Sequence, residues 1–202
     1  MGHHPGTRNR LAFDKRWPMV LERALTARGS EVRVIENCLN GRKTVWDDPF
    51  RPGRNGAGGL AEAIELNAPL ALVVIALGTN DFQATHDISA WMSAQGVGRL
   101  VDIVRQAPIE PGLPRPDILI VAPPRIEEPK GDNIFKFVGA ARRSEGFAGL
   151  LQAAAEAKAA HFFDMNGVTS ASLVDGIHLD EDQHMAVGEA MAPDVRRVLE
   201  MG

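Results

Sequence analysis

The 202-residue sequence contains a single cysteine, Cys38, and therefore cannot form an internal disulfide. It also lacks an apolar run of about 18 residues and a signal peptide, the usual marks of a membrane-spanning helix and of secretion. No basic tract is longer than two residues and the formal net charge is −4, so the sequence does not support a nucleic-acid-binding surface. We expect a soluble cytoplasmic protein whose partners are small molecules, with neither nucleic acid nor membrane among them.

The composition is typical of one compact α/β domain. Hydrophobic residues make up 45% of the chain and charged residues 24%, which gives enough core for folding without disulfides or metals. No internal repeat appears, and no linker is long enough to divide the chain. We therefore expect a single domain over residues 1–202.

Segments with helical periodicity alternate with short apolar segments that are typical of strands. The expected helices span residues 15–28, 60–66, 88–106, about 132–159 and the segment after 180, and the expected strands span 31–36, 70–77, 118–122 and 161–164. The strand at 70–77 is continuously apolar, so it should be buried on both faces at the centre of the sheet. This alternation predicts a parallel three-layer α/β/α sheet, with a mobile Pro-rich loop at 123–131.

Three short motifs are expected at the sheet edge where α/β proteins bind ligands. Gly78-Thr79-Asn80-Asp81 follows the apolar strand, and the Asn80 amide could donate to an oxyanion. In Leu39-Asn40-Gly41-Arg42, the Gly41 N–H could approach a reacting oxygen because no Cβ obstructs it. In Asp175-Gly176-Ile177-His178, the carboxylate could hold Nδ1–H of the imidazole and leave Nε2 free to deprotonate a serine.

These three blocks, in this order and spacing, resemble those of the SGNH hydrolases, the GDSL-type esterases and lipases. The resemblance covers nearly the whole chain and is strongest to the bacterial arylesterase and acyltransferase branch, in which oligomers are common. Further matching strings are Arg16-Trp17-Pro18, residues 40–49, Arg54-Asn55-Gly56 and residues 121–124. The resemblance implies a flavodoxin-like sheet, an oxyanion hole containing Gly41 and Asn80, and an Asp175/His178 pair. It also implies hydrolysis, or acyl transfer, of small carboxylic or aryl esters through an acyl-serine, without a cofactor.

The sequence does not contain the nucleophile of that family. The family's first block is Gly-Asp-Ser-Leu-Thr and two further residues, which Met1-Gly2 resembles. None of the six serines lies in a Gly-Asp-Ser or Gly-x-Ser-x-Gly motif: Ser30, Ser89, Ser93, Ser144, Ser170 and Ser172. We expect the serine and the first strand to lie upstream of Met1, which would leave two sheet edges unpaired. The alternative is an inactive SGNH-like binding or scaffold protein that has lost its nucleophile.

Several apolar side chains could line a substrate pocket or an interface. Trp46, Phe82 and Ile126 are the pocket candidates, and core packing is an equally good interpretation of each. Trp46, Phe50 and Ile126 are expected to be exposed, which predicts a closed homo-oligomer.

The remaining polar motifs have ordinary explanations. His3 and His4 are interpreted as solvated, because no third ligand accompanies them, and no metal is expected. Asp47 and Asp48 could pair with Arg42 or Arg54, or could face solvent in a turn before Pro49. The segment 56–61 loosely matches a dinucleotide-binding fingerprint, but no strand precedes it, so it is interpreted as the loop before a helix.

Overall fold

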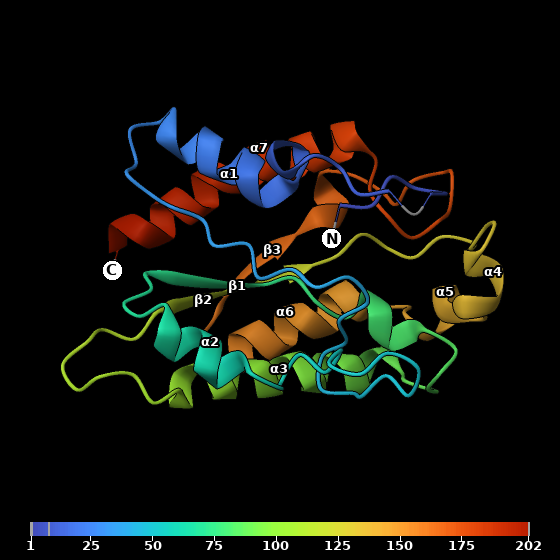
Figure 1. The fold of residues 1–202 in the computed structure, drawn as a ribbon, viewed down its shortest axis with the longest axis horizontal. Helices are drawn as coiled ribbons and strands as arrows, with labels where there is room; N and C mark the ends of the chain where they lie inside the picture. Colours follow the sequence, from blue (N-terminus) through green and yellow to red (C-terminus); the bar gives the residue numbers. More distant parts are fainter. Residues whose placement is uncertain (1, 8, 202) are drawn as a thin grey trace.

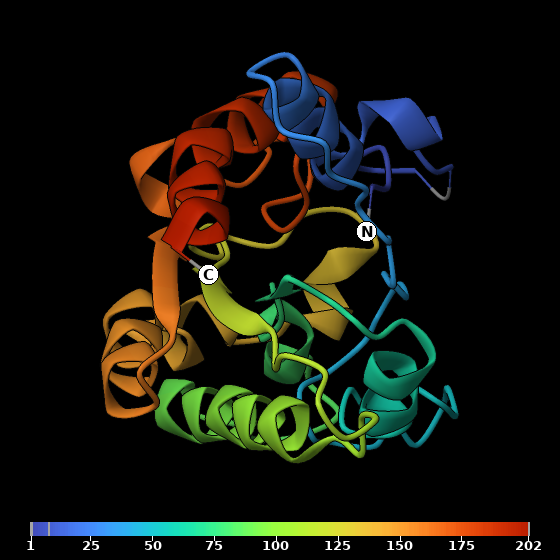
Figure 2. The same cartoon turned by 90° about the vertical axis from the view of Figure 1, so that its left-hand side faces the viewer.

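The computed structural model describes residues 2–7 and 9–201, which form three layers around a parallel sheet (Figure 1). The sheet contains β1 (Leu72–Ile75), β2 (Asp117–Ala122) and β3 (His161–Asp164), in that order. One face carries α1 (Trp17–Thr26) and α7 (Glu181–Met201), and the other carries α2 (Leu60–Leu66), α3 (Ala90–Gln106) and α6 (Phe147–Ala157) (Figure 2). The predicted α/β/α class is confirmed. Met1 lies outside the described residues.

The central strand β2 divides the core into two parts because its side chains point alternately to opposite faces. Ile118, Ile120 and Ala122 pack with residues of α3 and α6, whereas Leu119 and Val121 pack with residues of α1 and α7. Five of the six β2 residues are buried. The loops that follow the three strands therefore begin at the end of a well-packed sheet.

The prediction of a strand at 31–36 is wrong. These residues keep the alternating exposure of a strand, but they form no ladder with any described residue. Their contacts are made by side chains instead: Glu36 accepts from Arg16 Nη1 at 3.0 Å, and Glu22 Oε2 accepts from Val34 N–H at 2.5 Å. An alternating pattern makes a segment suitable for a sheet, but a strand forms only when its backbone hydrogen bonds to a neighbouring strand.

The apolar run at 70–77 forms β1, which is shorter than predicted and lies at an edge of the sheet rather than at its centre. Only Ile75 of β1 is fully buried, and the other three residues are partly exposed. These residues are partly exposed because, among described residues, β1 pairs with a strand on one side only, which is β2.

The helix expected at about 132–159 is interrupted. It is divided into α4 (Asn133–Lys136), α5 (Ala140–Arg143) and α6. The breaks fall at Gly139 and Gly146, where φ is +67° and +73°, a left-handed conformation that ends a helix. Short 3₁₀ turns lie at Phe13–Lys15, Thr79–Phe82 and Met165–Gly167.

Two helix starts use side-chain caps. Ser89 Oγ accepts from Met92 N–H before α3. Before α7, the Asp180 N–H donates to Gln183 Oε1 at 2.8 Å, which is a capping-box contact. Across residues 2–7 and 9–201, no helix combines the length and apolarity needed to cross a bilayer.

Candidate active site

Asp175 and His178 meet in the turn that precedes α7. The His178 Nδ1–H donates to Asp175 Oδ2 at 2.6 Å. Asp175 Oδ1 accepts from the backbone N–H groups of Ile177 and His178, both at 3.0 Å, and Oδ2 also accepts from Gly6 N–H at 3.2 Å. The Asp175 side chain is 4% exposed and the His178 side chain 34%, so a buried carboxylate holds a ring that remains accessible.

Hydrogen bonding keeps the buried carboxylate ionised. Burial alone would raise the pKa of Asp175, but bonds from the His178 ring and from the His178 and Ile177 backbone outweigh it and hold the pKa well below its usual value. An ionised Asp175 fixes the proton on Nδ1, so Nε2 is the ring nitrogen available as a base.

The loop at 123–131 braces this turn. Glu127 N–H donates to Gly176 O at 2.9 Å, and Lys130 N–H donates to Asp175 O at 3.1 Å. Gly176 has φ +76°, and a Cβ there would collide with Glu128 O. The loop that the sequence indicated as mobile is therefore hydrogen bonded to the candidate acid–base pair.

The predicted oxyanion donors are brought together from two distant loops. Asn80 Nδ2 donates to the carbonyl of Arg42 at 3.2 Å, and Arg42 directly follows Gly41. Asn80 lies in the turn after β1, at the C-terminal edge of the sheet (Figure 1). Within the described residues the Gly41 N–H has no hydrogen-bond partner, so both donors can turn to a ligand oxygen.

A fully buried carboxylate fastens these two loops to each other. Asp81 accepts from Thr44 N–H at 2.8 Å, from Thr44 Oγ1 at 2.7 Å and from Ser93 Oγ in α3 at 2.7 Å. Burial raises the pKa of Asp81, and the bonds from Thr44 and Ser93 oppose that rise. The three bonds fix the separation between the Gly41 loop and the Asn80 turn.

A buried lysine then sets the orientation of the Asn80 amide. Lys43 Nζ donates to Asn80 O at 3.0 Å, to Thr85 Oγ1 at 3.2 Å and to Gln83 Oε1 at 3.3 Å. Because an ammonium group has no acceptor, the oxygen of Gln83 must face it, and Gln83 Nε2 then donates to Asn80 Oδ1 at 2.7 Å. This chain of donors leaves the Asn80 NH₂ group directed toward the Gly41 loop. Burial lowers the pKa of Lys43, while nearby Asp48 and Asp81 raise it.

Sequence reasoning did not identify these supporting residues: Lys43, Thr44, Asp81, Gln83 and Ser93. In the sequence, Asp81 was noted only as the last residue of the Asn80 motif, and Ser93 only among the serines that lack a nucleophile motif. A usable indication was present, because a carboxylate that directly follows a buried strand needs several donors to be stable there.

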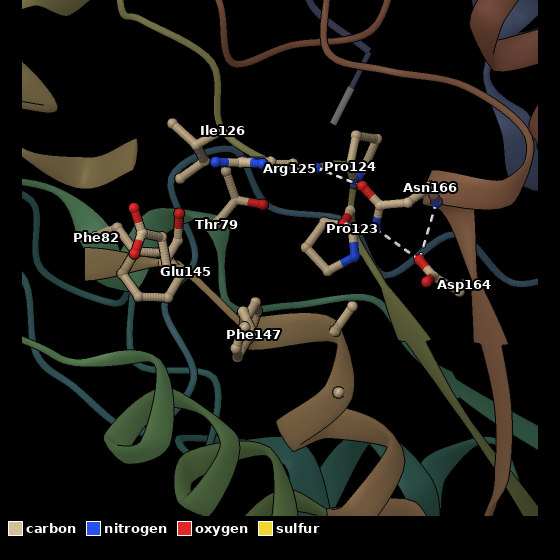
Figure 3. A pocket seen from close by; sticks show the side chains of 14 residues that line it. Thr79, Phe82, Pro123, Pro124, Arg125, Ile126, Glu145, Phe147, Asp164 and Asn166 are labelled. Atoms are coloured by element: carbon tan, nitrogen blue, oxygen red, sulfur yellow. Dashed lines mark hydrogen bonds between the residues drawn. The ribbon is translucent and has the colours of Figure 1, made fainter. Parts of the chain in front are cut away.

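Two of the three predicted pocket residues line one cavity of about 280 Å³ (Figure 3). Phe82 is fully buried, with its ring 5.2 Å from that of Phe147, and Ile126 is only 3% exposed, so the expectation of an exposed Ile126 is wrong. Trp46 lines neither this cavity nor the one described below, because its loop packs the indole 6.5 Å from the His86 ring. Phe50 is 80% exposed, as expected.

Asp47 and Asp48, in the turn before Pro49, form contacts other than those predicted. Asp48 is buried, and its Oδ2 lies 3.9 Å from Lys43 Nζ, whereas Asp47 Oδ1 accepts from Asn55 Nδ2. Arg42 donates to Asn37 O, and Arg54 donates to Asn40 O. The possible pairs with Arg42 and Arg54 are not formed, and the alternative of a solvent-facing turn holds for the exposed Asp47 but not for the buried Asp48.

His3 is not solvated as expected. Its ring centroid lies 6.1 Å from that of His178, and its Nε2 is buried without a partner among described residues. Burial lowers the pKa of His3, followed by nearby positive charges. In the part of the chain that the structure describes, no group of three or more His, Cys, Asp or Glu side chains could hold a metal ion.

No serine hydroxyl in the described part of the chain is hydrogen bonded to the His178 ring. Ser93 is committed to Asp81, and Ser144 donates to Ala141 O. Ser172 is the nearest in sequence, but it is fully buried and its Oγ accepts from Val174 N–H. The Asp175–His178 pair is therefore formed without a serine partner among the described residues.

A carboxylate-oriented imidazole beside two potential oxyanion donors, at the C-terminal edge of a parallel sheet, is an arrangement typical of ester hydrolases. The chain belongs to the GDSL-like lipase/acylhydrolase family, whose sequence model matches residues 4–186. The predicted membership is confirmed, and by family the protein is a hydrolytic enzyme.

Solved structures agree over nearly the whole chain. A carbohydrate acetylesterase family member from Sinorhizobium meliloti is 35% identical with a TM-score of 0.91, covering 98% of this chain and 93% of that one. An aryl esterase from M. smegmatis is 33% identical with a TM-score of 0.91, covering 98% and 94%. A putative arylesterase from Agrobacterium tumefaciens is 37% identical with a TM-score of 0.87, covering 98% and 93%. A search of curated proteins gave no match.

Proposed function

We propose that the protein is a serine esterase that cleaves small carboxylic or aryl esters through an acyl-serine intermediate. The observation that carries this proposal is the 2.6 Å contact between His178 Nδ1 and a buried, ionised Asp175. Three backbone N–H groups stabilise that carboxylate, so the imidazole is oriented before substrate arrives. The similarity to solved aryl and carbohydrate esterases supports the same reaction class.

In the proposed reaction, His178 Nε2 takes the proton of a serine hydroxyl while the serine oxygen bonds to the ester carbonyl carbon. The carbonyl oxygen becomes an oxyanion that accepts from Gly41 N–H and Asn80 Nδ2. The imidazolium then gives its proton to the leaving alcohol as the carbon–oxygen bond breaks. Water, deprotonated by His178, releases the acid, and an alcohol in place of water would make the step an acyl transfer.

The attacking serine is proposed to precede residue 1, at the end of a strand that pairs with β1. Two observations support this position. The hydroxyls of Ser93, Ser144 and Ser172 are hydrogen bonded elsewhere, and among described residues β1 keeps one edge unpaired despite its apolar sequence. Each buried backbone group left unpaired costs about 1 to 3 kcal/mol, so a partner strand would stabilise the sheet considerably.

The cavity beside Thr79 limits the size of the group that it can hold. About 280 Å³ is at the small end of ligand pockets, and the apolar Phe82 and Ile126 line it. We therefore propose short acyl groups such as acetyl as the preferred substrates.

A closed homo-oligomer is also proposed. Phe50 and Phe135 are 80% and 84% exposed, and large exposed aromatic side chains favour self-association. A monomeric mass by light scattering at micromolar concentration would contradict this state without affecting the proposed reaction.

The test compares the 202-residue chain with the natural polypeptide that includes its upstream residues. The longer protein should hydrolyse aryl acetates with an initial burst and be labelled covalently by a fluorophosphonate on a serine in a Gly-Asp-Ser sequence. The 202-residue chain should do neither. Labelling of an internal serine in the shorter chain would contradict the proposed nucleophile.

The competing function is an inactive SGNH-like binding or scaffold protein. It is favoured by one observation, the absence of a serine at His178 among the described residues. An in-frame stop codon directly before Met1, together with no labelling of the natural protein, would favour this alternative over the esterase.

A further inference from the structure

A second cavity, of about 610 Å³, shares no lining residue with the first. Gln83, whose amide orients Asn80, lines it together with the exposed Phe50 and Phe135. No residue of this cavity takes part in the proposed reaction itself.

Two cationic side chains line the cavity without a neutralising partner. Neither the Arg51 guanidinium nor the Lys136 ammonium forms a hydrogen bond or ion pair with any described residue; Lys136 Nζ lies 5.4 Å from the centroid of the Phe137 ring. Arg51 is half-buried, and a Cβ built on Gly41 would lie 2.9 Å from its Nη1. The guanidinium is therefore next to one of the two proposed oxyanion donors.

The carboxylate of the cavity is already engaged. Asp48 Oδ1 accepts from Phe50 N–H at 2.9 Å and Arg51 N–H at 3.1 Å, while its Oδ2 lies 3.9 Å from buried Lys43. The Asp48 side chain is 4% exposed, so it presents almost no charge to a ligand. Asp48 therefore offsets the positive charge of Arg51 and Lys136 only in part, and it is the single carboxylate among the described residues that line the cavity.

The same charges act on the pKa of Lys136, whose side chain is exposed. Burial lowers this pKa, the positive charges of Arg51 and Lys43 lower it further, and the Asp48 carboxylate opposes them. Like charges that converge on a concave surface repel one another, and an anion between them would reduce that repulsion. A guanidinium and an ammonium group together suit a carboxylate, which can accept from both.

We propose that this cavity binds a carboxylate carried by the ester substrate, so that the preferred substrates are anionic esters rather than neutral ones. The inference rests on the proposed esterase function and adds the substrate class. The carboxylate would accept from Arg51 and Lys136 while the ester carbonyl lies at Gly41 and Asn80. It can be attached to the alcohol or to the acyl part of the ester.

Two substrate pairs distinguish these attachments. The first is 4-acetoxybenzoate against its neutral methyl ester, with the charge on the alcohol side. The second is 4-nitrophenyl hemisuccinate against 4-nitrophenyl butyrate, with the charge on the acyl side. For each pair, the ratio of kcat/KM for the anionic to the neutral ester is measured in the natural protein, Arg51→Gln, Lys136→Gln and the control Arg99→Gln, which removes an exposed charge of α3.

For one pair, the ratio should fall about tenfold in Arg51→Gln and by a similar factor in Lys136→Gln, because each change removes a charge-assisted hydrogen bond. It should stay within twofold of the natural value in Arg99→Gln. Ratios that are unchanged in both cavity variants for both pairs would overturn the inference while leaving the esterase proposal intact.

Binding gives a readout that does not need turnover. Calorimetry with the natural protein compares the amide analogues 4-acetamidobenzoate and N-phenylsuccinamate with neutral acetanilide. One of the two carboxylates should bind more tightly than acetanilide and lose that advantage in Arg51→Gln. Absence of turnover in every protein, with this binding difference present, would count against the esterase only; equal binding of all three probes would overturn the carboxylate site.

Discussion

The two halves of the candidate site are built in opposite ways. The acid–base half is one four-residue turn, in which Asp175 receives bonds from Ile177 and His178, two and three residues away. The oxyanion half joins residues 38 positions apart, Arg42 and Asn80, through buried Asp81 and Lys43. The first half is specified mainly by local sequence, with further bonds from Gly6 and from the 123–131 loop, whereas the second depends on the folded core. We expect the first to depend most on its own residues and the second to be sensitive to residues that never contact substrate.

The largest effect on catalysis is expected in the acid–base half. In the natural polypeptide with its upstream serine, His178→Ala should lower kcat for aryl acetates by about 10⁴-fold to 10⁶-fold, because no other group can deprotonate the nucleophile. His161→Ala, at the opposite edge of the sheet, is the matched control and should change kcat little. Comparable losses in both variants would remove His178 from the mechanism.

In the oxyanion half, Asn80→Ala should lower kcat by about 100-fold to 1000-fold with a smaller change in KM, since an oxyanion donor acts mainly in the transition state. Asn67→Ala, which removes an exposed amide at the end of α2, provides the control. A change confined to KM would indicate that Asn80 binds substrate without stabilising the oxyanion.

The folding stability of the region around the acid–base half should depend on pH through His184, at the start of α7. This side chain is 3% exposed, its Nδ1 accepts from Trp17 N–H at 3.3 Å, and burial lowers its pKa to about 4. The unfolded chain binds a proton near pH 6.5 and the folded chain does not, so stability is full above that pH and falls as the pH drops toward 4. The total loss should be about 3 kcal/mol.

Thermal melting between pH 8 and 5 measures this effect. His184→Asn keeps an acceptor for Trp17 N–H and removes the titrating group, so its Tm should change less over the same range. Equal pH slopes in both proteins would show that His184 is not responsible. His3, whose pKa is also lowered, contributes in the same direction in both proteins.

The smallest effect is expected for the positioning residue Gln83. Gln83→Glu keeps an acceptor for Lys43 but cannot donate to Asn80 Oδ1, so the Asn80 amide loses its fixed orientation. We expect kcat to fall about tenfold, the equivalent of one hydrogen bond, with KM nearly unchanged. In an Asn80→Ala background the same change should have no further effect, and a full second loss there would exclude the positioning role.

The sequence predicted the acid–base half well because its geometry follows from four consecutive residues. It predicted Gly41 and Asn80 as oxyanion donors from their residue types, from their places near expected strand ends and from the spacing of family blocks. The contacts that fix them, from Asp81 to Ser93 and from Lys43 to Gln83, depend on how α3 and two loops pack, which no local pattern encodes. The prediction of a strand at 31–36 failed for the same reason. Alternation indicates which side chains face the core, but it does not indicate whether another strand lies beside the segment.

The open edge of β1 has a consequence for the protein outside the active site. Leu72 to Val74 are apolar, partly exposed and, among described residues, paired on one side only. Such an edge is a template for any extended peptide, including one from another copy of the chain. Preparations of the 202-residue chain should therefore aggregate through this strand. The amide protons of β1 should also exchange with solvent far faster than those of β2, which hydrogen–deuterium exchange can measure strand by strand.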